Sequence, residues 1–171
     1  MRSIFTIGHS TRPIEEFVAM LEAHGVEKLI DIRTVPRSRT NPQFNRDALP
    51  SSLERADIGY LHMPALGGLR RPKADSQNTG WRNANFRGYA DYMQTGEFSA
   101  AIEELIELGR ETQIAIMCAE AVPWRCHRSL VADALTVRGV STEHIMAAGR
   151  RQPHAITPFA KVTDTSVTYP G

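Results

Sequence analysis

At 171 residues the chain is long enough to bury a hydrophobic core in one domain without disulfides or metal ions as cross-links. Hydrophobic residues at 42% and charged residues at 23% are ordinary for a globular protein, which excludes a disordered or fibrous chain. Twenty Lys and Arg against nineteen Asp and Glu give a formal net charge of +1, so no global field draws the chain to nucleic acid or to a membrane surface.

No apolar run approaches the roughly 20 residues that span a bilayer, so no membrane partner is expected. The N-terminal segment lacks the apolar core and cleavage site of a secretory signal, which predicts a cytoplasmic protein. In such a reducing compartment a structural disulfide between Cys118 and Cys126 is not expected, which leaves a buried thiol, a reactive thiol or a metal ligand.

The first third of the chain predicts a strand, a helix and a second strand. Residues 3–7 form a short apolar strand pattern, and apolar residues then recur at helical spacing between Pro13 and Gly25. Residues 26–32 predict the second strand. This order favours a parallel sheet with a right-handed crossover.

The middle of the chain contains two segments without periodicity. Residues 33–46 carry two prolines and several arginines and predict a basic loop, and residues 69–85 predict a second loop that is also basic. Between them, residues 47–56 predict a short helix and residues 60–63 a short strand. Loops of this length inside a domain are usually functional or disordered.

The last part of the chain returns to regular patterns. We expect helices over residues 86–93 and from Phe98 to Gly109, a buried strand over residues 114–118, and a helix from about Pro123 to Gly139. A last strand is predicted over residues 142–146, and residues 150–171 predict an irregular tail that packs on the body.

Together these elements predict an α/β fold: one domain over residues 1–171, with a mainly parallel sheet flanked by helices. Polar side chains follow four of the predicted strands, at His9 and Ser10, Asp31 and Arg33, His62, and Cys118 and Glu120. The carboxyl ends of parallel strands share one edge of a sheet, which is where open α/β proteins bind ligands. We therefore expect the site at this edge.

Cys126, His127 and Arg128 are predicted to occupy the first turns of the helix after Pro123. A thiol there has a lowered pKa, and the neighbouring imidazole and guanidinium add positive charge, so Cys126 is the favoured thiolate. Helix decoration, with His127 bonded to a backbone carbonyl, is the alternative.

Cys118, a loop and Arg125 together resemble the thiolate loops of rhodanese-like and tyrosine-phosphatase-like enzymes. In those loops, backbone N–H groups, a helix dipole and an arginine favour both a thiolate and an anionic substrate. The spacing here is one residue longer, and Glu120 places a carboxylate where the anion belongs. A small apolar role for Cys118 in its strand is weighed equally.

Two further groups near the predicted edge could bind an anion. Gly8 and Ser10 lie in a turn before a helix, where backbone N–H groups and a hydroxyl can hold phosphate. Asp31 and Arg33 either pair with each other or serve a substrate, with Asp31 orienting a hydroxyl or His9. Two basic clusters could also bind a polyanion backbone, although solvated loop charges are the commoner case. They are Arg33, Arg37, Arg39 and Arg46 in the first loop and Arg70, Arg71 and Lys73 in the second.

A metal site would combine Cys118, Cys126 and His127 with His9 or Glu120. Zinc takes such ligands, but the spacing matches neither a CxxC pair nor an HExxH helix, so no cofactor is predicted and zinc stays the minority alternative.

Ten sequence segments resemble the bacterial family known as domain of unknown function 488, almost from end to end of the chain. These segments are TIGHS (6–10), EEF (15–17), DIRTVPRSR (31–39), PQF (42–44), YLHMPALGG (60–68), FRGYADYM (86–93), MCAE (117–120), CHR (126–128), HI (144–145) and TYP (168–170). The resemblance implies an α/β fold and no agreed reaction. The candidate site residues that fall on these segments are Gly8, His9, Ser10, Asp31, Arg33, Cys118, Glu120, Cys126, His127 and Arg128.

The favoured hypothesis is an enzyme, a hydrolase or transferase with a reactive thiol, acting on a phosphate-bearing or other anionic substrate such as a nucleotide or nucleic-acid component. Arg33, Arg125 or Arg128 would bind the anion, and Glu120 or His9 would act as general acid or base. The alternatives are a nucleic-acid-binding accessory module without turnover and a metal-binding protein. The sequence does not indicate an oligomeric state.

Overall fold

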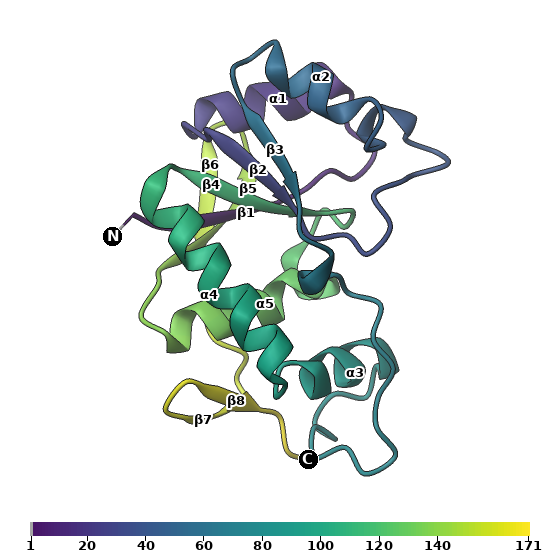
Figure 1. The fold of residues 1–171 in the computed structure, drawn as a ribbon, viewed down its shortest axis with the longest axis vertical. Helices are drawn as coiled ribbons and strands as arrows, with labels where there is room; N and C mark the ends of the chain where they lie inside the picture. The colour runs from purple at the N-terminus through teal and green to yellow at the C-terminus, as the bar shows by residue number, and fades with distance from the viewer. Residues whose placement is uncertain (1) are drawn as a thin grey trace.

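Six strands form one sheet in the order β3-β2-β4-β1-β5-β6 in the computed structural model, which describes residues 2–171 (Figure 1). The first five strands in this order are parallel, and β6 runs antiparallel to β5 at one edge. The strands are β1 (Ile4–Gly8), β2 (Lys28–Asp31), β3 (Gly59–His62), β4 (Ile114–Cys118), β5 (Thr142–Ala147) and β6 (Arg150–Pro153). A mainly parallel α/β sheet is therefore confirmed.

Helices cover both faces of this sheet (Figure 1). They are α1 (Ile14–Ala23), α2 (Leu49–Glu54), α3 (Ala84–Tyr92), α4 (Gly96–Glu111) and α5 (Arg128–Val137). Apolar side chains of α1 and α2 pack on one face, and those of α3, α4 and α5 pack on the other. Across residues 2–171, every helix is too short or too polar to cross a membrane.

The central strand β4 shows why the sheet is buried on both sides. Ile114 and Ile116 point into the cluster with α4 and α5, and Ala115 and Met117 point into the cluster with α1 and α2. Successive side chains of a strand face opposite sides, so a continuous apolar run is needed where helices cover both faces. The strand is correspondingly inaccessible to water.

The connections diverge at the carboxyl ends of two neighbouring strands. From β2 the chain leads to α2 on one face of the sheet, while from adjacent β4 it leads to α5 on the other face. Loops that leave in opposite directions open a crevice between them, which is the usual ligand position in doubly wound sheets. The fold thus provides a crevice between the loops that follow β2 and β4.

Two predicted helix boundaries are wrong. The helix expected from Pro123 begins at Arg128, because a single 3₁₀ turn, η3 (Pro123–Arg125), is followed by an extended residue at Cys126. The helix expected to stop at Gly109 continues to Glu111, since Gly109 lies on the buried face of α4 and tertiary packing outweighs its low helix propensity.

The tail is more ordered than the predicted irregular segment. It contains β6 and a hairpin of β7 (Lys161–Thr163) and β8 (Ser166–Thr168). Buried Asp133 of α5 accepts hydrogen bonds from the side chains of His154, Thr157 and Tyr169. The Asp133 carboxylate therefore connects three residues of the tail to α5 by hydrogen bonds.

Candidate functional site

A pocket of about 320 Å³ occupies the crevice between the loops after β2 and β4. Its lining consists of Arg33, Thr34, Val35, Arg37, Gly68, Leu69, Asn85, Phe86, Cys118, Ala119, Glu120, Arg125, Cys126 and His127. These residues come from four separate parts of the sequence. Both cysteines of the chain, an imidazole and three guanidiniums meet there.

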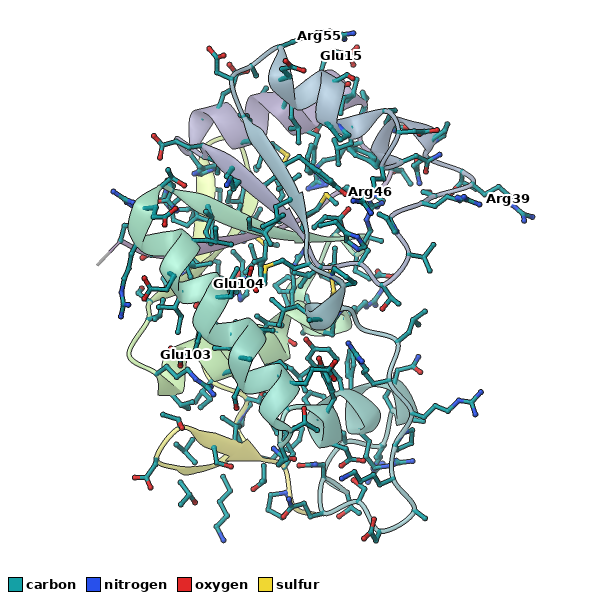
Figure 2. All side chains as sticks on the ribbon, viewed as in Figure 1. Glu15, Arg39, Arg46, Arg55, Glu103 and Glu104 are labelled. Atoms are coloured by element: carbon teal, nitrogen blue, oxygen red, sulfur yellow. A yellow bond between two sulfur atoms is a disulfide. The ribbon has the colours of Figure 1, made fainter. Side chains whose placement is uncertain are left out.

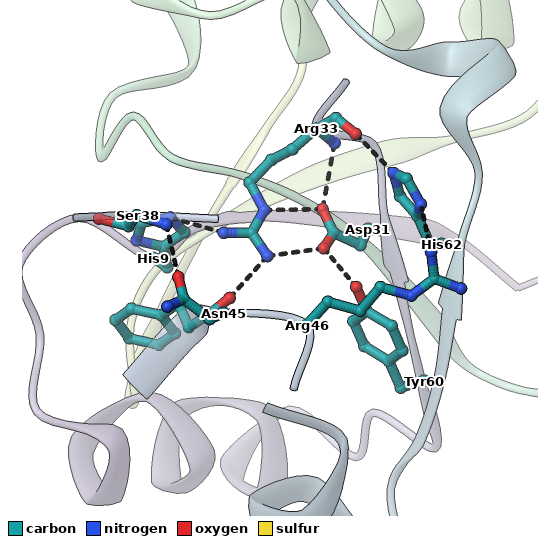
Figure 3. A network of polar contacts seen from close by, with 9 residues as sticks. His9, Asp31, Arg33, Ser38, Asn45, Arg46, Tyr60 and His62 are labelled. Carbon is teal, nitrogen blue, oxygen red and sulfur yellow. Dashed lines mark hydrogen bonds and ion pairs between the residues drawn. The ribbon is translucent and has the colours of Figure 1, made fainter. Parts of the chain in front are cut away.

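Asp31 and Arg33 form a buried pair at the carboxyl end of β2 (Figure 3). The Arg33 Nε and Nη2 donate to the two oxygens of Asp31 at 2.9 and 2.7 Å, and Nη2 also donates to the Phe44 carbonyl at 2.7 Å. Such bidentate contacts are the strong form of the ion pair. Of the two roles predicted for these residues, the structure shows mutual pairing.

His9 lies beside this pair and is uncharged at neutral pH. Its Nδ1 donates to the Ser10 carbonyl at 2.8 Å, which leaves Nε2 to accept from the Nη1 of Arg33 at 3.4 Å. Burial, then the nearby Arg33 cation, lowers the pKa of His9 to about 4. The ring stacks on Phe44 with centroids 4.4 Å apart, so His9 is held firmly by its neighbours.

Two residues of β3 complete the network (Figure 3). The Tyr60 hydroxyl donates to Asp31 at 2.6 Å, and burial together with this bond raises the pKa of Tyr60. His62 donates through Nε2 to the Arg33 carbonyl at 2.7 Å. Sequence reasoning placed His62 at this edge and missed Tyr60, although its position two residues earlier puts it on the same side of the strand.

The sulfur atoms of Cys118 and Cys126 are joined as a disulfide, and no cysteine of the described chain is free. The expectation that the two cysteines are not paired is therefore wrong. The chain between them reverses direction, because Arg128 donates to the carbonyls of Glu120 and Ala121 at 2.9 Å each. This reversal returns Cys126 to the end of β4.

His127 is the N-cap residue of α5 and lies against Cys126. Its Nε2 donates to the Ile32 carbonyl at 2.9 Å, so the proton is on Nε2 and Nδ1 faces the Cys126 sulfur at 3.5 Å. Burial lowers the pKa of His127 to about 4. Gly68 permits this position, since a Cβ there would lie 2.6 Å from Nδ1.

Arg128 is fully buried and has no carboxylate within ion-pair distance among the described residues. Besides the two carbonyls, its Nη1 lies 3.5 Å from the Cys118 sulfur, and its Nε has no hydrogen-bond partner. Burial lowers the pKa of Arg128 to about 9, so it remains charged at neutral pH. The Glu120 carboxylate partly opposes this lowering of the Arg128 pKa from beyond ion-pair distance, and the group in contact that can carry a negative charge is the Cys118 thiol.

The family model described as Domain of unknown function DUF488 matches residues 13–135. The chain belongs to this family. No match was found among curated proteins or among solved structures. The matched residues of this DUF488 protein include the Asp31–Arg33 pair, both cysteines, His127 and Arg128.

Gly8 ends β1 opposite Cys118, and the backbone N–H of Ser10 donates to the Ala119 carbonyl in the loop after β4. A Cβ at Gly8 would overlap the Glu120 carbonyl and come within 2.6 Å of the Arg128 guanidinium. Only glycine therefore lets the loop after β4 pack this closely against β1. Ser10 has a positive φ of 50° and borders a second hollow of about 420 Å³ with His9. Glu120 and Arg125 border both hollows.

The predicted site residues thus divide into two groups in this DUF488 protein. Cys118, Glu120, Arg125, Cys126 and His127 line the pocket of the thiols. By contrast, the arginine predicted to bind anions after β2, Arg33, has its guanidinium committed to Asp31 and Phe44. The cations at the mouth without an acidic partner in the described residues are Arg37 and Arg125, both exposed, and Arg37 was predicted only as a contact for a polyanion.

Of the ligands considered for zinc, Cys118, Cys126 and His127 lie together, but the two sulfur atoms are bonded to each other. His9 directs Nδ1 to the Ser10 carbonyl and Nε2 to Arg33, away from both thiols. Over residues 2–171, no group of three or more His, Cys, Asp or Glu side chains is arranged to hold a metal ion.

Proposed function

We propose that this DUF488 protein is an enzyme that acts on a small phosphate-bearing or otherwise anionic substrate, such as a nucleotide, with a reactive thiol at the floor of the pocket. One observation carries the proposal: two cysteines, a neutral imidazole and exposed guanidiniums border the same pocket. Thiols beside cations and a helix N-terminus are the microenvironments in which cysteine acts as a nucleophile.

Arg37 and Arg125 are the anion-binding residues in this proposal. They come from the loops on the two sides of the crevice, and neither forms an ion pair with an acidic side chain of residues 2–171. Two guanidiniums that converge from opposite walls suit a phosphate or carboxylate group. Arg33 and Arg128 do not bind the substrate in this proposal, because their guanidiniums bond to other groups of the protein.

Glu120 is the general acid or base of this scheme. Its carboxylate is exposed and belongs to the loop that follows Cys118, so a proton can pass between substrate and solvent. A carboxylate beside a thiol and two guanidiniums is compatible with hydrolysis or group transfer.

Protection from alkylation tests the proposal. We expect iodoacetamide to modify one cysteine of the reduced, folded protein within minutes at neutral pH, and inorganic phosphate or a nucleoside monophosphate to slow it. Arg125→Gln should weaken this protection about tenfold, since a charge-assisted bond contributes about 1.5–3 kcal/mol. Arg55→Gln at the C-cap of α2 is the matched control, because Arg55 is exposed at a remote end of the molecule (Figure 2).

Protection that is absent at millimolar anion, or equal in the two variants, would remove the anionic substrate from the proposal. Alkylation of both cysteines only after denaturation would remove the reactive thiol.

The basic loop over residues 33–46 supports a second candidate, binding of nucleic acid without turnover. Arg39 extends from the tip of this loop into solvent, and Arg46 lies at its base (Figure 2). The basic residues of the loop over residues 69–85 are less available to nucleic acid, because the Arg70 guanidinium lies 3.6 Å over the Tyr92 ring and donates to backbone carbonyls. Salt-dependent retention of short single-stranded DNA, lost in Arg39→Gln, would favour this candidate.

A further inference from the structure

We propose that Cys118 and Cys126 work as a dithiol–disulfide couple that reduces small disulfides carrying negative charge. Cys118 is the attacking thiolate and Cys126 is the resolving thiol. The proposal rests on the proposed function for its site, the pocket of the thiols, and adds to it a redox reaction and a substrate class.

The first observation is the separate activation of each sulfur. The Cys118 sulfur lies 3.5 Å from the Nη1 of Arg128, and the Cys126 sulfur lies 3.5 Å from the Nδ1 of His127. One sulfur is next to a permanent cation and the other is next to a base. A cross-link that only stabilises the fold requires neither.

Arg128 determines which thiol ionises first. Its guanidinium is 0% exposed, is bonded only to neutral oxygens apart from the sulfur contact, and has an unpartnered Nε. A buried cation is costly unless a negative charge compensates it. The exposed Glu120 carboxylate acts on Arg128 only from beyond ion-pair distance, and Arg12 adds opposing positive charge. Ionisation of Cys118 supplies the missing negative charge, so the reduced protein holds Cys118 as a thiolate.

His127 prepares the second thiol for its attack. The carbonyl of Ile32 accepts the Nε2 proton, which fixes the tautomer with a free lone pair on Nδ1 toward Cys126. Because the pKa of His127 is about 4, this nitrogen is unprotonated at neutral pH. It can take the Cys126 proton when that sulfur becomes a nucleophile.

The reaction balances with a substrate disulfide as the oxidant. The Cys118 thiolate attacks one sulfur of the substrate, forms a mixed disulfide and releases the other half as a thiolate. Cys126 gives its proton to His127, attacks the Cys118 sulfur and releases the second half as a thiolate. His127 then returns that proton to a released thiolate. Two electrons pass from the cysteines to the substrate, and the Cys118–Cys126 bond closes.

The pocket lining indicates the substrate class. Arg37 and Arg125 at the mouth suit carboxylates or phosphates. Leu69, which is 68% exposed, and Phe86 supply apolar surface beside them. A disulfide with apolar or aromatic halves that carry acidic groups fits both features.

The test uses the full chain, reduced and freed of reductant, with 5,5′-dithiobis(2-nitrobenzoate) as the anionic disulfide. For the wild type we expect two molar equivalents of thionitrobenzoate per chain, and by intact mass an internal disulfide with no retained adduct. Cys126→Ser should release one equivalent and keep the mixed disulfide on Cys118. Cys118→Ser should react at least about tenfold more slowly, because its remaining thiol lacks the cation.

Substitutions of Arg128 and His127 test whether Arg128 stabilises the Cys118 thiolate and whether His127 accepts the Cys126 proton. Arg128→Gln should shift the pH midpoint of the first release upward by about one unit, toward the ordinary cysteine pKa of about 8.5, whereas Arg128→Lys should keep it low. His127→Gln should leave the first release unchanged and slow the second by about a hundredfold. A purely structural role for these residues would change neither the midpoint nor the ratio of the two phases.

Uncharged 4,4′-dithiodipyridine separates this inference from the proposed function. Equal rates with the charged and uncharged reagents would defeat the anionic substrate class and leave the dithiol couple standing. Retention of a mixed disulfide by the wild type, or no release from the folded chain, would defeat the couple. Anion protection from iodoacetamide would then still support the proposed function.

Discussion

Two buried arginines at the same edge of the sheet have opposite surroundings. Arg33 is 7% exposed and is matched by the carboxylate of Asp31 on two nitrogens. Arg128 is 0% exposed and is met by two carbonyls and a sulfur, with one nitrogen left without a partner. The charge of Arg33 is compensated by a carboxylate in contact, whereas that of Arg128 is not.

This difference separates scaffold from chemistry. A buried charge that is fully paired holds neighbouring elements in place, and here Asp31 and Arg33 join β2 to Tyr60 of β3 and to Phe44 of the loop between them. A buried charge without a counter-ion costs stability and creates a site for an anion. We therefore assign Arg33 to the framework and Arg128 to the thiol.

Breaking the paired arginine should give the largest effect. We expect Arg33→Met to lower the free energy of unfolding by about 3–5 kcal/mol, because it leaves the buried Asp31 carboxylate without its cation. Urea unfolding followed by circular dichroism measures this change.

Removing both charges should restore part of the loss. In Asp31→Asn/Arg33→Met no unpaired charge remains, so we expect a more stable protein than the single Arg33→Met variant. A double variant as unstable as the sum of its two singles would show that Asp31 and Arg33 act independently.

Much of this framework could be predicted from the sequence. The apolar runs and helical spacings predicted a parallel sheet, and the polar residues after each strand predicted that His9, Asp31, His62 and Cys118 share one edge. The register confirms this placement, with Gly8 opposite Cys118 and Asp31 opposite His62. These features depend on local patterns of the chain and on the rule that parallel strands end together.

The division of roles at the edge could not be predicted from the same patterns. Whether Asp31 takes Arg33 or a substrate depends on side-chain geometry, and the contact of Arg128 with Cys118 depends on a loop reversal that no periodicity encodes. The pairing of Cys118 with Cys126 follows from that reversal. The tail strands were missed because short polar strands carry a weak signal.

The next largest loss of stability should come from substitution of Gly8, which lies against the Arg128 guanidinium. Gly8→Ala places a methyl group against the Glu120 carbonyl and the Arg128 guanidinium, so we expect a loss of about 2–3 kcal/mol from overpacking. Gly96→Ala is the matched control, because a Cβ there has no neighbour within 4 Å and the residue opens a helix. It should be neutral or stabilising by about 0.5 kcal/mol. Equal losses in the two variants would contradict the close approach.

Acid should lower the free energy of unfolding through two neutral histidines, His9 beside Arg33 and His127 next to Arg128. The pKa values of His9 and His127 are lowered to about 4 from about 6.5 in the unfolded chain, so the unfolded state binds more protons between these values. Stability should therefore fall as the pH falls, by about 1–2 kcal/mol per histidine between pH 7 and pH 5. His127→Gln should show a shallower fall than the wild type in urea unfolding across this range. Parallel pH profiles for the two proteins would contradict the neutral imidazole.

Removing the unpaired arginine, Arg128, should give the smallest change in the free energy of unfolding. In Arg128→Met the protein loses two hydrogen bonds to carbonyls but no longer has to bury an uncompensated cation, so the two contributions offset each other. We expect a change within about 1 kcal/mol, against about 3–5 kcal/mol for Arg33→Met, when both proteins are unfolded in urea at neutral pH with the Cys118–Cys126 disulfide closed. Equal losses would mean that Arg128 has a counter-ion as effective as Asp31 even when Cys118 is not ionised, and the Glu120 carboxylate would then be the group to test by repeating the measurement in Glu120→Gln.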